Sequence, residues 1–172
     1  MATASAPEPR TPPVLHLICG KIASGKSTLA RHLAEAPATV RLSEDEWLAA
    51  LFSEQMRTGA DYLRCAALLR GAIGPHVVGL LRAGVSVVMD FPANTEEQRA
   101  WMARLLEDSG AAHRMHVIEA PDDLCLARLK ARNAGGAHPF AATEAQFRRF
   151  TKHYAPPKPE EGFRLVVHTA LP

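Results

Sequence analysis

Short apolar runs recur along the chain, and each is separated from the next by a stretch with helical periodicity. Such runs predict strands, and the first of them, VLHLIC, predicts a buried strand. The predicted strands cover residues 14–19, 39–43, 85–90, 113–120 and 163–169. The predicted helices cover residues 26–36, a segment from about Glu44, and residues 61–82, 95–109, 122–133 and 143–153, with a bend at Gly74 and Pro75 in the third.

Strands that alternate with helices predict a mostly parallel sheet with helices on both of its faces. In such a sheet, ligands bind beyond the carboxyl ends of the strands. The chemistry is therefore expected near Gly20, Ser43, Asp90 and Ala120. The first 13 residues are small, polar and proline-rich. They are expected to form a disordered N-terminal tail ahead of one domain that spans residues 14–172.

The loop after the first predicted strand has an unusual composition. Its sequence GKIASGKS, residues 20–27, fits the pattern G-x-x-x-x-G-K-[ST] of a phosphate-binding P-loop. The glycines let backbone N–H groups converge on phosphate oxygens, and the helix that begins near Lys26 adds the positive end of its dipole. The loop is therefore predicted to bind a nucleoside triphosphate. The residues expected to contact it are Gly20, Lys21, Ile22, Ala23, Ser24, Gly25, Lys26, Ser27 and Thr28.

Two side chains of this loop and one acid after it have more specific predicted roles. Lys26 is expected to neutralise charge on the β- and γ-phosphates, and the Ser27 hydroxyl to bind Mg²⁺. Asp90 ends the third predicted strand and is the second expected magnesium ligand, the alternative being a plain turn residue. Phe91 follows, where a motor ATPase typically carries a second acid that activates water. This difference favours phosphoryl transfer to a bound acceptor over hydrolysis.

Three acids, Glu44 to Glu46, follow the second predicted strand in the sequence RLSEDEW. Ser43 and Glu46 fit a capping box, and Glu44 suits the N-terminus of a helix. Asp45 is then available to face the cleft, where it is predicted to be the general base that accepts the proton of a substrate hydroxyl. The alternative is that all three acids are solvated residues of the first helical turn.

Arg128 and Arg132 are four residues apart on one predicted helix and therefore share a face. A loop of small residues with glycines follows them. This arrangement predicts a lid around residues 128–145 whose arginines close over the transferring phosphates. The alternative for both arginines is a solvated face, and His138 is open between a lid contact and a surface position. The basic residues expected on a solvated face are Arg104, Lys130, Arg148 and Arg149.

The composition narrows the class of protein. A formal net charge of +2 is too small to predict a nucleic-acid-binding surface. No apolar run is long enough to predict a membrane span. Cys19, Cys65 and Cys125 are far apart without metal-ligand spacing, which favours reduced thiols in a cytoplasmic protein.

These motifs together resemble a known group of enzymes. The chain from about Val14 to His168 is similar to small P-loop kinases related to polynucleotide kinase, zeta toxins and chloramphenicol phosphotransferase, often catalogued loosely as AAA-domain ATP-binding proteins. The resemblance rests on GKIASGKST, RLSEDEW, VVMDFPANTEEQR and RLKARN. It implies that residues 20–28 bind ATP, that Asp45 is the acceptor-side base and that the two arginines belong to the lid. Polynucleotide kinases carry a basic residue three positions after the base, where this chain has Leu48.

The sequence thus predicts a three-layer α/β P-loop NTPase fold of the nucleoside-kinase type, with a five-stranded parallel sheet and a helical lid. The predicted activity is transfer of the γ-phosphoryl group of Mg·ATP to a hydroxyl of a small molecule. Two alternatives stay open, an ATP-dependent switch or ATPase that acts through a protein partner and a polynucleotide 5′-hydroxyl kinase. The predicted catalytic residues are Lys26, Asp45, Arg128 and Arg132, and the predicted metal ligands are Ser27 and Asp90.

Overall fold

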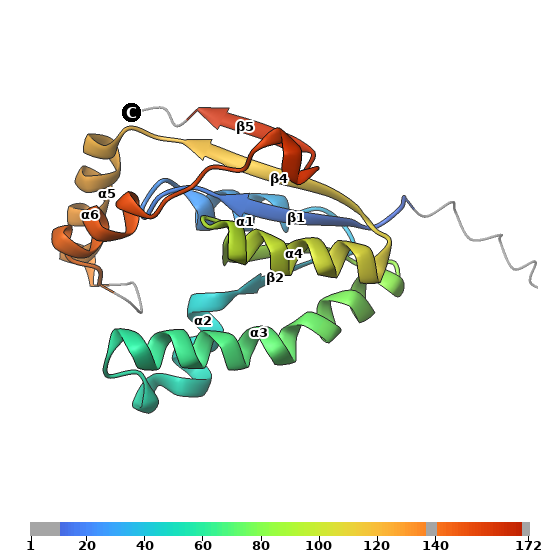
Figure 1. Cartoon of the computed structure of the whole chain (residues 1–172), viewed down its shortest axis with the longest axis horizontal. Helices are drawn as coiled ribbons and strands as arrows, with labels where there is room; N and C mark the ends of the chain where they lie inside the picture. Colours follow the sequence, from blue (N-terminus) through green and yellow to red (C-terminus); the bar gives the residue numbers. More distant parts are fainter. Residues whose placement is uncertain (1–10, 137–140, 170–172) are drawn as a thin grey trace, which may run out of the picture.

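Five parallel strands form the sheet at the centre of the computed structural model, which describes residues 11–136 and 141–169 (Figure 1). The strand order is β2-β3-β1-β4-β5, and every neighbouring pair is parallel. The predicted five-stranded parallel sheet is therefore confirmed. The strands are β1 (Val14–Cys19), β2 (Thr39–Ser43), β3 (Ser86–Pro92), β4 (Ala112–Glu119) and β5 (Leu165–Thr169).

The helices follow the predicted order with shifted ends. They are α1 (Lys26–Leu33), α2 (Glu44–Phe52), α3 (Gly59–Arg82), α4 (Glu96–Ser109), α5 (Asp122–Gly135) and α6 (Glu144–Lys152), with short 3₁₀ turns at Ser53–Gln55 and Pro159–Glu161. α1 ends earlier than predicted, in a turn where Ala38 has a positive φ of 51°. α3 begins earlier, because Thr58 and Asp61 form a capping box. Pro75 lies inside α3 without ending it.

The two faces of the sheet carry different apolar clusters, which gives the three predicted layers. α3 and α4 cover one face, and the largest cluster joins them to α2 and to side chains of β1, β3 and β4. α1 covers the other face, where Ala30 packs against Ile18, Val88 and Ile118. Across residues 11–136 and 141–169, no helix combines the length and the apolar character that crossing a membrane requires.

α5 and α6 stand at the end of the sheet toward which β4 and β5 point (Figure 1). Their cluster consists of Ala120, Cys125, Leu129 and Phe147, and it packs against Ile22 and Ala23 of the loop after β1. The helix that carries both predicted lid arginines, α5, therefore belongs to a cluster that packs against the predicted phosphate loop. His138 lies outside the described residues, as do residues 1–10 of the predicted tail.

Candidate active site

The loop from Gly20 to Ser27 has a backbone that most residues could not adopt. Gly25 has a φ of 109°, and Ala23 has a φ of 58°. A Cβ atom at Gly20 would lie 2.6 Å from Ser24 Oγ, which is closer than real contacts allow. Glycine is therefore required at position 25 for its conformation and at position 20 for its close contacts.

The start of α1 is suited to an anion. Gly25 is the N-cap residue, no described side chain caps the helix, and its first turn carries no acid. Ser24 Oγ is buried and finds no hydrogen-bond partner among the described residues. The N–H groups and the positive dipole end of α1 therefore remain available to phosphate oxygens, as the sequence pattern predicted.

The Lys26 ammonium group lies across this loop. Its Nζ donates hydrogen bonds to the carbonyl oxygens of Gly20 and Lys21, each at 2.6 Å. Burial lowers the pKa of Lys26, and the negative charges of Asp90 and Asp45 oppose that shift. A phosphate group would supply this half-buried ammonium with a stronger partner than neutral carbonyls do.

Ser27 and Asp90 meet at the edge of the loop. Ser27 Oγ donates to Asp90 Oδ1 at 3.2 Å, and Arg41 Nη1 donates to Asp90 Oδ2 at 3.1 Å. A hydroxyl and a carboxylate are the hard oxygen ligands that Mg²⁺ prefers, so the pair fits such an ion. Asp90 lies opposite Ser43 of β2. It is inside β3 and not at its end, because the strand continues to Pro92.

The acids at the start of α2 differ from the sequence expectation. Ser43 is the N-cap residue but makes no side-chain cap hydrogen bond, so the predicted Ser43–Glu46 capping box is wrong. Glu46 instead accepts from Arg41 Nη2 at 2.5 Å, a charged partner that a backbone N–H cannot match. Glu44 is only 1% exposed, so the alternative of three solvated acids is also wrong.

Asp45, the second residue of α2, acts through its charge on one cation of the loop and one arginine of α5. Burial lowers the pKa of Arg132, and the charge of Asp45 is the influence that opposes it. Asp45 also raises the pKa of Lys26 against the effect of burial, after the larger influence of Asp90. Its carboxylate is therefore close enough to act on both predicted phosphate-binding cations.

The two predicted lid arginines are partly buried, and one of them contacts the loop. Arg128 Nη1 donates to the carbonyl oxygen of Ser24 at 3.3 Å. Arg132 Nε is buried and has no hydrogen-bond partner among the described residues. The alternative of a solvated face is therefore wrong for this pair. The other basic residues that were expected on a solvated face are indeed exposed, namely Arg104, Lys130, Arg148 and Arg149.

Residues 15–157 match a family model described as an AAA domain. The chain belongs to the AAA domain family. None of the curated proteins matches it. The predicted resemblance is thus confirmed at the level of the family, and the solved structures confirm the fold.

Three solved structures are similar to this AAA domain over most of its length. A protein of Chloroflexus aurantiacus J-10-fl, provisionally described as a kinase, is 22% identical, with a TM-score of 0.72 over 92% of this chain and 85% of that chain. Kti12 of Chaetomium thermophilum, in complex with ADP-AlF3, is 14% identical, with a TM-score of 0.69 over 91% and 89%. The APS kinase of Mycobacterium tuberculosis, in complex with AMPPNP and APS, is 23% identical, with a TM-score of 0.60 over 94% and 90%.

Sequence reasoning missed Asn94, which binds the first residue of the phosphate loop in this AAA domain. Its Oδ1 accepts a hydrogen bond from the backbone N–H of Gly20 at 2.9 Å. Its own N–H donates to Gln98, the partner of Thr95 in the capping box of α4. The sequence offered one signal for this role, because the amide of Asn94 lies between the end of β3 and the capping box that begins α4.

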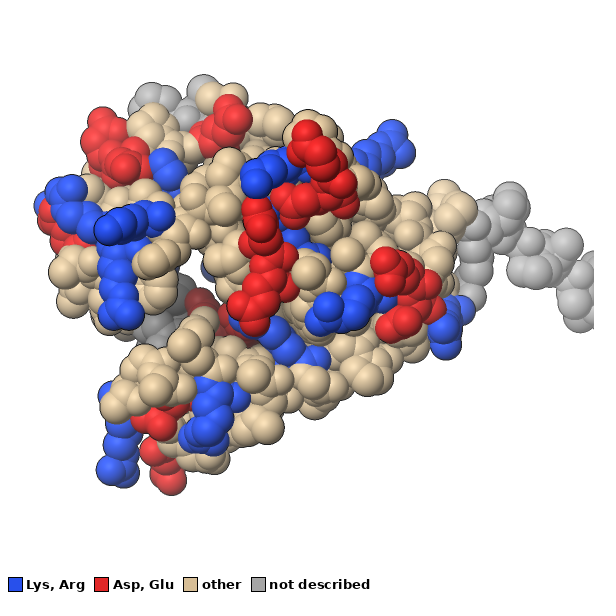
Figure 2. Space-filling view, viewed as in Figure 1, with Lys and Arg blue, Asp and Glu red and all other residues tan. Residues whose placement is uncertain are grey.

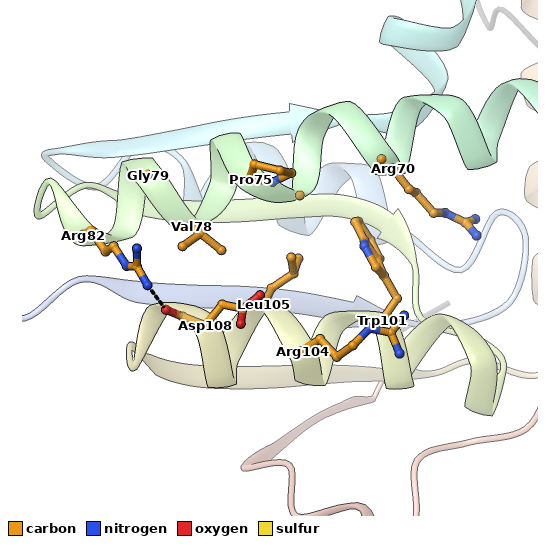
Figure 3. Close-up of a pocket in the computed structure, with 11 residues that line it drawn as sticks. Arg70, Pro75, Val78, Gly79, Arg82, Trp101, Arg104, Leu105 and Asp108 are labelled. Carbon is orange, nitrogen blue, oxygen red and sulfur yellow. Dashed lines mark hydrogen bonds between the residues drawn. The ribbon is translucent and has the colours of Figure 1, made fainter.

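The surface is hollowed in more than one place. The space-filling view is hollowed between the lobe of α2 and the start of α3 and the lobe of α5 and α6, at the left of Figure 2. A separate groove of about 480 Å³ lies between α3 and α4, where Gly74, Val78 and Leu105 contribute to its lining and Arg70 and Trp101 stand near one end (Figure 3). No residue of the phosphate loop lines the groove between α3 and α4.

Proposed function

We propose that this AAA domain is a phosphotransferase that moves the γ-phosphoryl group of ATP to a hydroxyl of a small molecule. The observation that carries the proposal is the position of Asp45, whose charge acts on both Lys26 of the loop and Arg132 of α5. A carboxylate beside two phosphate-binding cations is where a general base for an acceptor hydroxyl belongs. The similarity to an APS kinase in complex with AMPPNP and APS supports this assignment.

The proposed reaction is an in-line displacement. The residues from Gly20 to Thr28 bind the phosphates, and Lys26 stabilises negative charge on the transferring group. Asp45 accepts the hydroxyl proton while the acceptor oxygen bonds to the γ-phosphorus. The bond between that phosphorus and the β–γ bridging oxygen breaks, and ADP leaves. Mg²⁺, when bound, neutralises charge on the β- and γ-phosphates.

The described contacts support a small acceptor over a polynucleotide end. Leu48 occupies the position at which polynucleotide kinases carry a basic residue, and it is fully buried in the main core. That position therefore cannot present a cation to a nucleic-acid phosphate. The three cysteines are free and buried, which supports the proposed location in a reducing compartment, the cytoplasm.

The metal assignment predicts a change in magnesium dependence. Ser27→Ala and Asp90→Asn are each expected to raise the Mg²⁺ concentration needed for half-maximal turnover, because the first removes an oxygen ligand of the ion and the second removes the negative charge of its carboxylate ligand. Titration of the transfer rate with Mg²⁺ at saturating ATP measures the effect. If Asp90→Asn lowers the melting temperature and leaves the magnesium dependence unchanged, Asp90 is a structural partner of Arg41 instead.

The lid assignment predicts a selective loss of rate. Arg132→Ala is expected to lower kcat more than it weakens ATP binding, because a lid arginine interacts mainly with the transferring phosphoryl group. Arg149→Ala is the matched control, since Arg149 is an exposed residue of α6. Steady-state kinetics and calorimetry on both variants provide the comparison. Equal effects of the two substitutions would remove the reason to assign Arg132 to the site.

The proposed function is tested by a panel of hydroxyl compounds incubated with γ-labelled ATP and Mg²⁺. The expected result is one class of compound that acquires the label. Parallel reactions without acceptor measure hydrolysis, and Lys26→Ala protein measures contaminating activity. Release of labelled phosphate alone, at a rate that responds to an added protein and to no hydroxyl compound, would support the switch or ATPase alternative.

A further inference from the structure

Glu44 is an acid of α2 that the proposed chemistry does not use, yet it is the most deeply buried of the three acids that begin the helix. Its Oε1 accepts from Arg70 Nε at 3.2 Å and from Arg70 Nη2 at 3.1 Å. Its Oε2 accepts from the Tyr62 hydroxyl at 3.2 Å. Burial raises the pKa of Glu44, and the charge and hydrogen bonds of Arg70 oppose that shift. Both carboxylate oxygens are thus bound to side chains of α3.

The partners of Glu44 are themselves fixed. The Arg70 guanidinium lies 5.9 Å from the centre of the Trp101 ring, and Figure 3 shows both side chains near one end of the groove between α3 and α4. Trp101 also contacts Phe91, the residue after Asp90. The Tyr62 ring packs against the main core. The carboxylate of Glu44 is therefore bound to groups that cannot shift without disturbing the core.

The hydrogen bonds of Glu44 also affect Asp45, because the two residues are adjacent in the sequence. Glu44 is the first residue of α2, and Asp45 is the second. Successive helical residues differ by about 100° in direction, so a helix that directs Glu44 into α3 has a fixed direction for Asp45 as well. A rotation of α2 that moved Asp45 away from Lys26 and Arg132 would have to break the hydrogen bonds of Glu44.

We propose that Glu44 is a positioning residue for phosphoryl transfer, and that Arg70 and Tyr62 fix the direction of Asp45 through it. The inference rests on the proposed function and deepens it. Glu46 marks the contrast, since its side chain is 58% exposed and is paired with Arg41 at the molecular surface. Accurate placement matters because an error of about 1 Å in a reacting group can reduce a rate by about a hundredfold.

A double-mutant cycle separates positioning from general stabilisation. Glu44→Gln keeps the size of the side chain and removes its charge, and it is expected to lower kcat for labelled transfer by about tenfold to a hundredfold. Calorimetry is expected to give an unchanged ATP affinity, because the hydrogen bonds of Glu44 run to α3 and not to the loop. In an Asp45→Asn background, Glu44→Gln is expected to cause no further loss of rate, since Glu44 acts through Asp45.

Tyr62→Phe is the second variant, because it removes one hydrogen bond of Glu44 and keeps the ring in the core. It is expected to give a smaller loss with the same non-additivity, and it decides the question if Glu44→Gln does not fold. Arg70→Lys, which keeps a positive charge, should retain more activity than Arg70→Ala. The positioning role alone would be overturned if these substitutions lowered kcat by the same factor in the wild-type and Asp45→Asn backgrounds. A parallel loss of ATP affinity would overturn it as well. Absence of transfer by the wild-type protein would overturn the proposed function as well.

Discussion

Lys26→Ala is expected to weaken Mg·ATP binding by on the order of a hundredfold and to reduce phosphoryl transfer further. Truncation of a partly buried charged partner usually costs a complex about 2–5 kcal/mol, which sets this scale. The ammonium group already bonds to the carbonyl oxygens of Gly20 and Lys21, so it lies at the loop before any ligand is considered. Calorimetry with ATP and Mg²⁺ measures the affinity, and labelled product measures the transfer.

The same substitution should leave the fold intact. Burial lowers the pKa of Lys26, which means that the folded state disfavours its charged form. Removal of that charge is therefore expected to leave the melting temperature unchanged or raised. Lys158→Ala is the control for a lysine outside the site, because its ion pair with Glu96 is exposed and such pairs contribute little. An unchanged ATP affinity in the Lys26→Ala protein would contradict the phosphate role.

Features fixed by local pattern could be predicted from the sequence. The buried strands were visible as apolar runs, and the parallel sheet followed from their alternation with helices. The shape of the phosphate loop follows from glycine at positions 20 and 25, whose roles are geometric. The Thr95–Gln98 capping box is another feature of local pattern, since both partners lie within one turn of the chain.

Features that depend on distant partners could not be predicted. Ser43 and Glu46 have the spacing of a capping box, but Arg41 binds Glu46 in its place. Glu44 is bound by residues 18 and 26 positions further along the chain, in a helix whose packing the sequence pattern does not give. The burial of Arg99 could not be predicted either, because its partner Glu161 is 62 residues away in the chain.

A chain of three histidines across the sheet is a further example of such dependence. His116 of β4 forms hydrogen bonds with His16 of β1 at 3.0 Å and with His168 of β5 at 2.9 Å. Burial lowers the pKa of His116 to about 4, and the charges of its two neighbours act in the same direction. These contacts follow from the register of three parallel strands, which local periodicity leaves undetermined.

Asp45→Asn is expected to leave ATP binding about as it is and to reduce transfer to the acceptor by roughly two to four orders of magnitude, the usual contribution of a positioned general base. Asparagine keeps the size and part of the hydrogen bonding of aspartate, but it cannot accept the hydroxyl proton. Asp45 is not a ligand of the phosphates, and loss of its negative charge removes no attraction to them, so ATP binding is expected to be retained. ATP affinity, melting temperature and labelled product are measured on the same preparation.

Glu46→Gln is the matched control for Asp45→Asn, because it removes the same charge one residue further along α2. Glu46 is exposed and pairs with Arg41, so its loss should cost about 1 kcal/mol of stability or less and leave most of the transfer rate. If both substitutions lower the melting temperature by similar small amounts and neither slows transfer selectively, the acids act only on helix stability. If Asp45→Asn transfers phosphate at the wild-type rate, the base must be another group. A selective loss of phosphoryl transfer in Asp45→Asn alone would identify the second residue of α2 as the proton acceptor. The buried Glu44 fixes the direction of that residue.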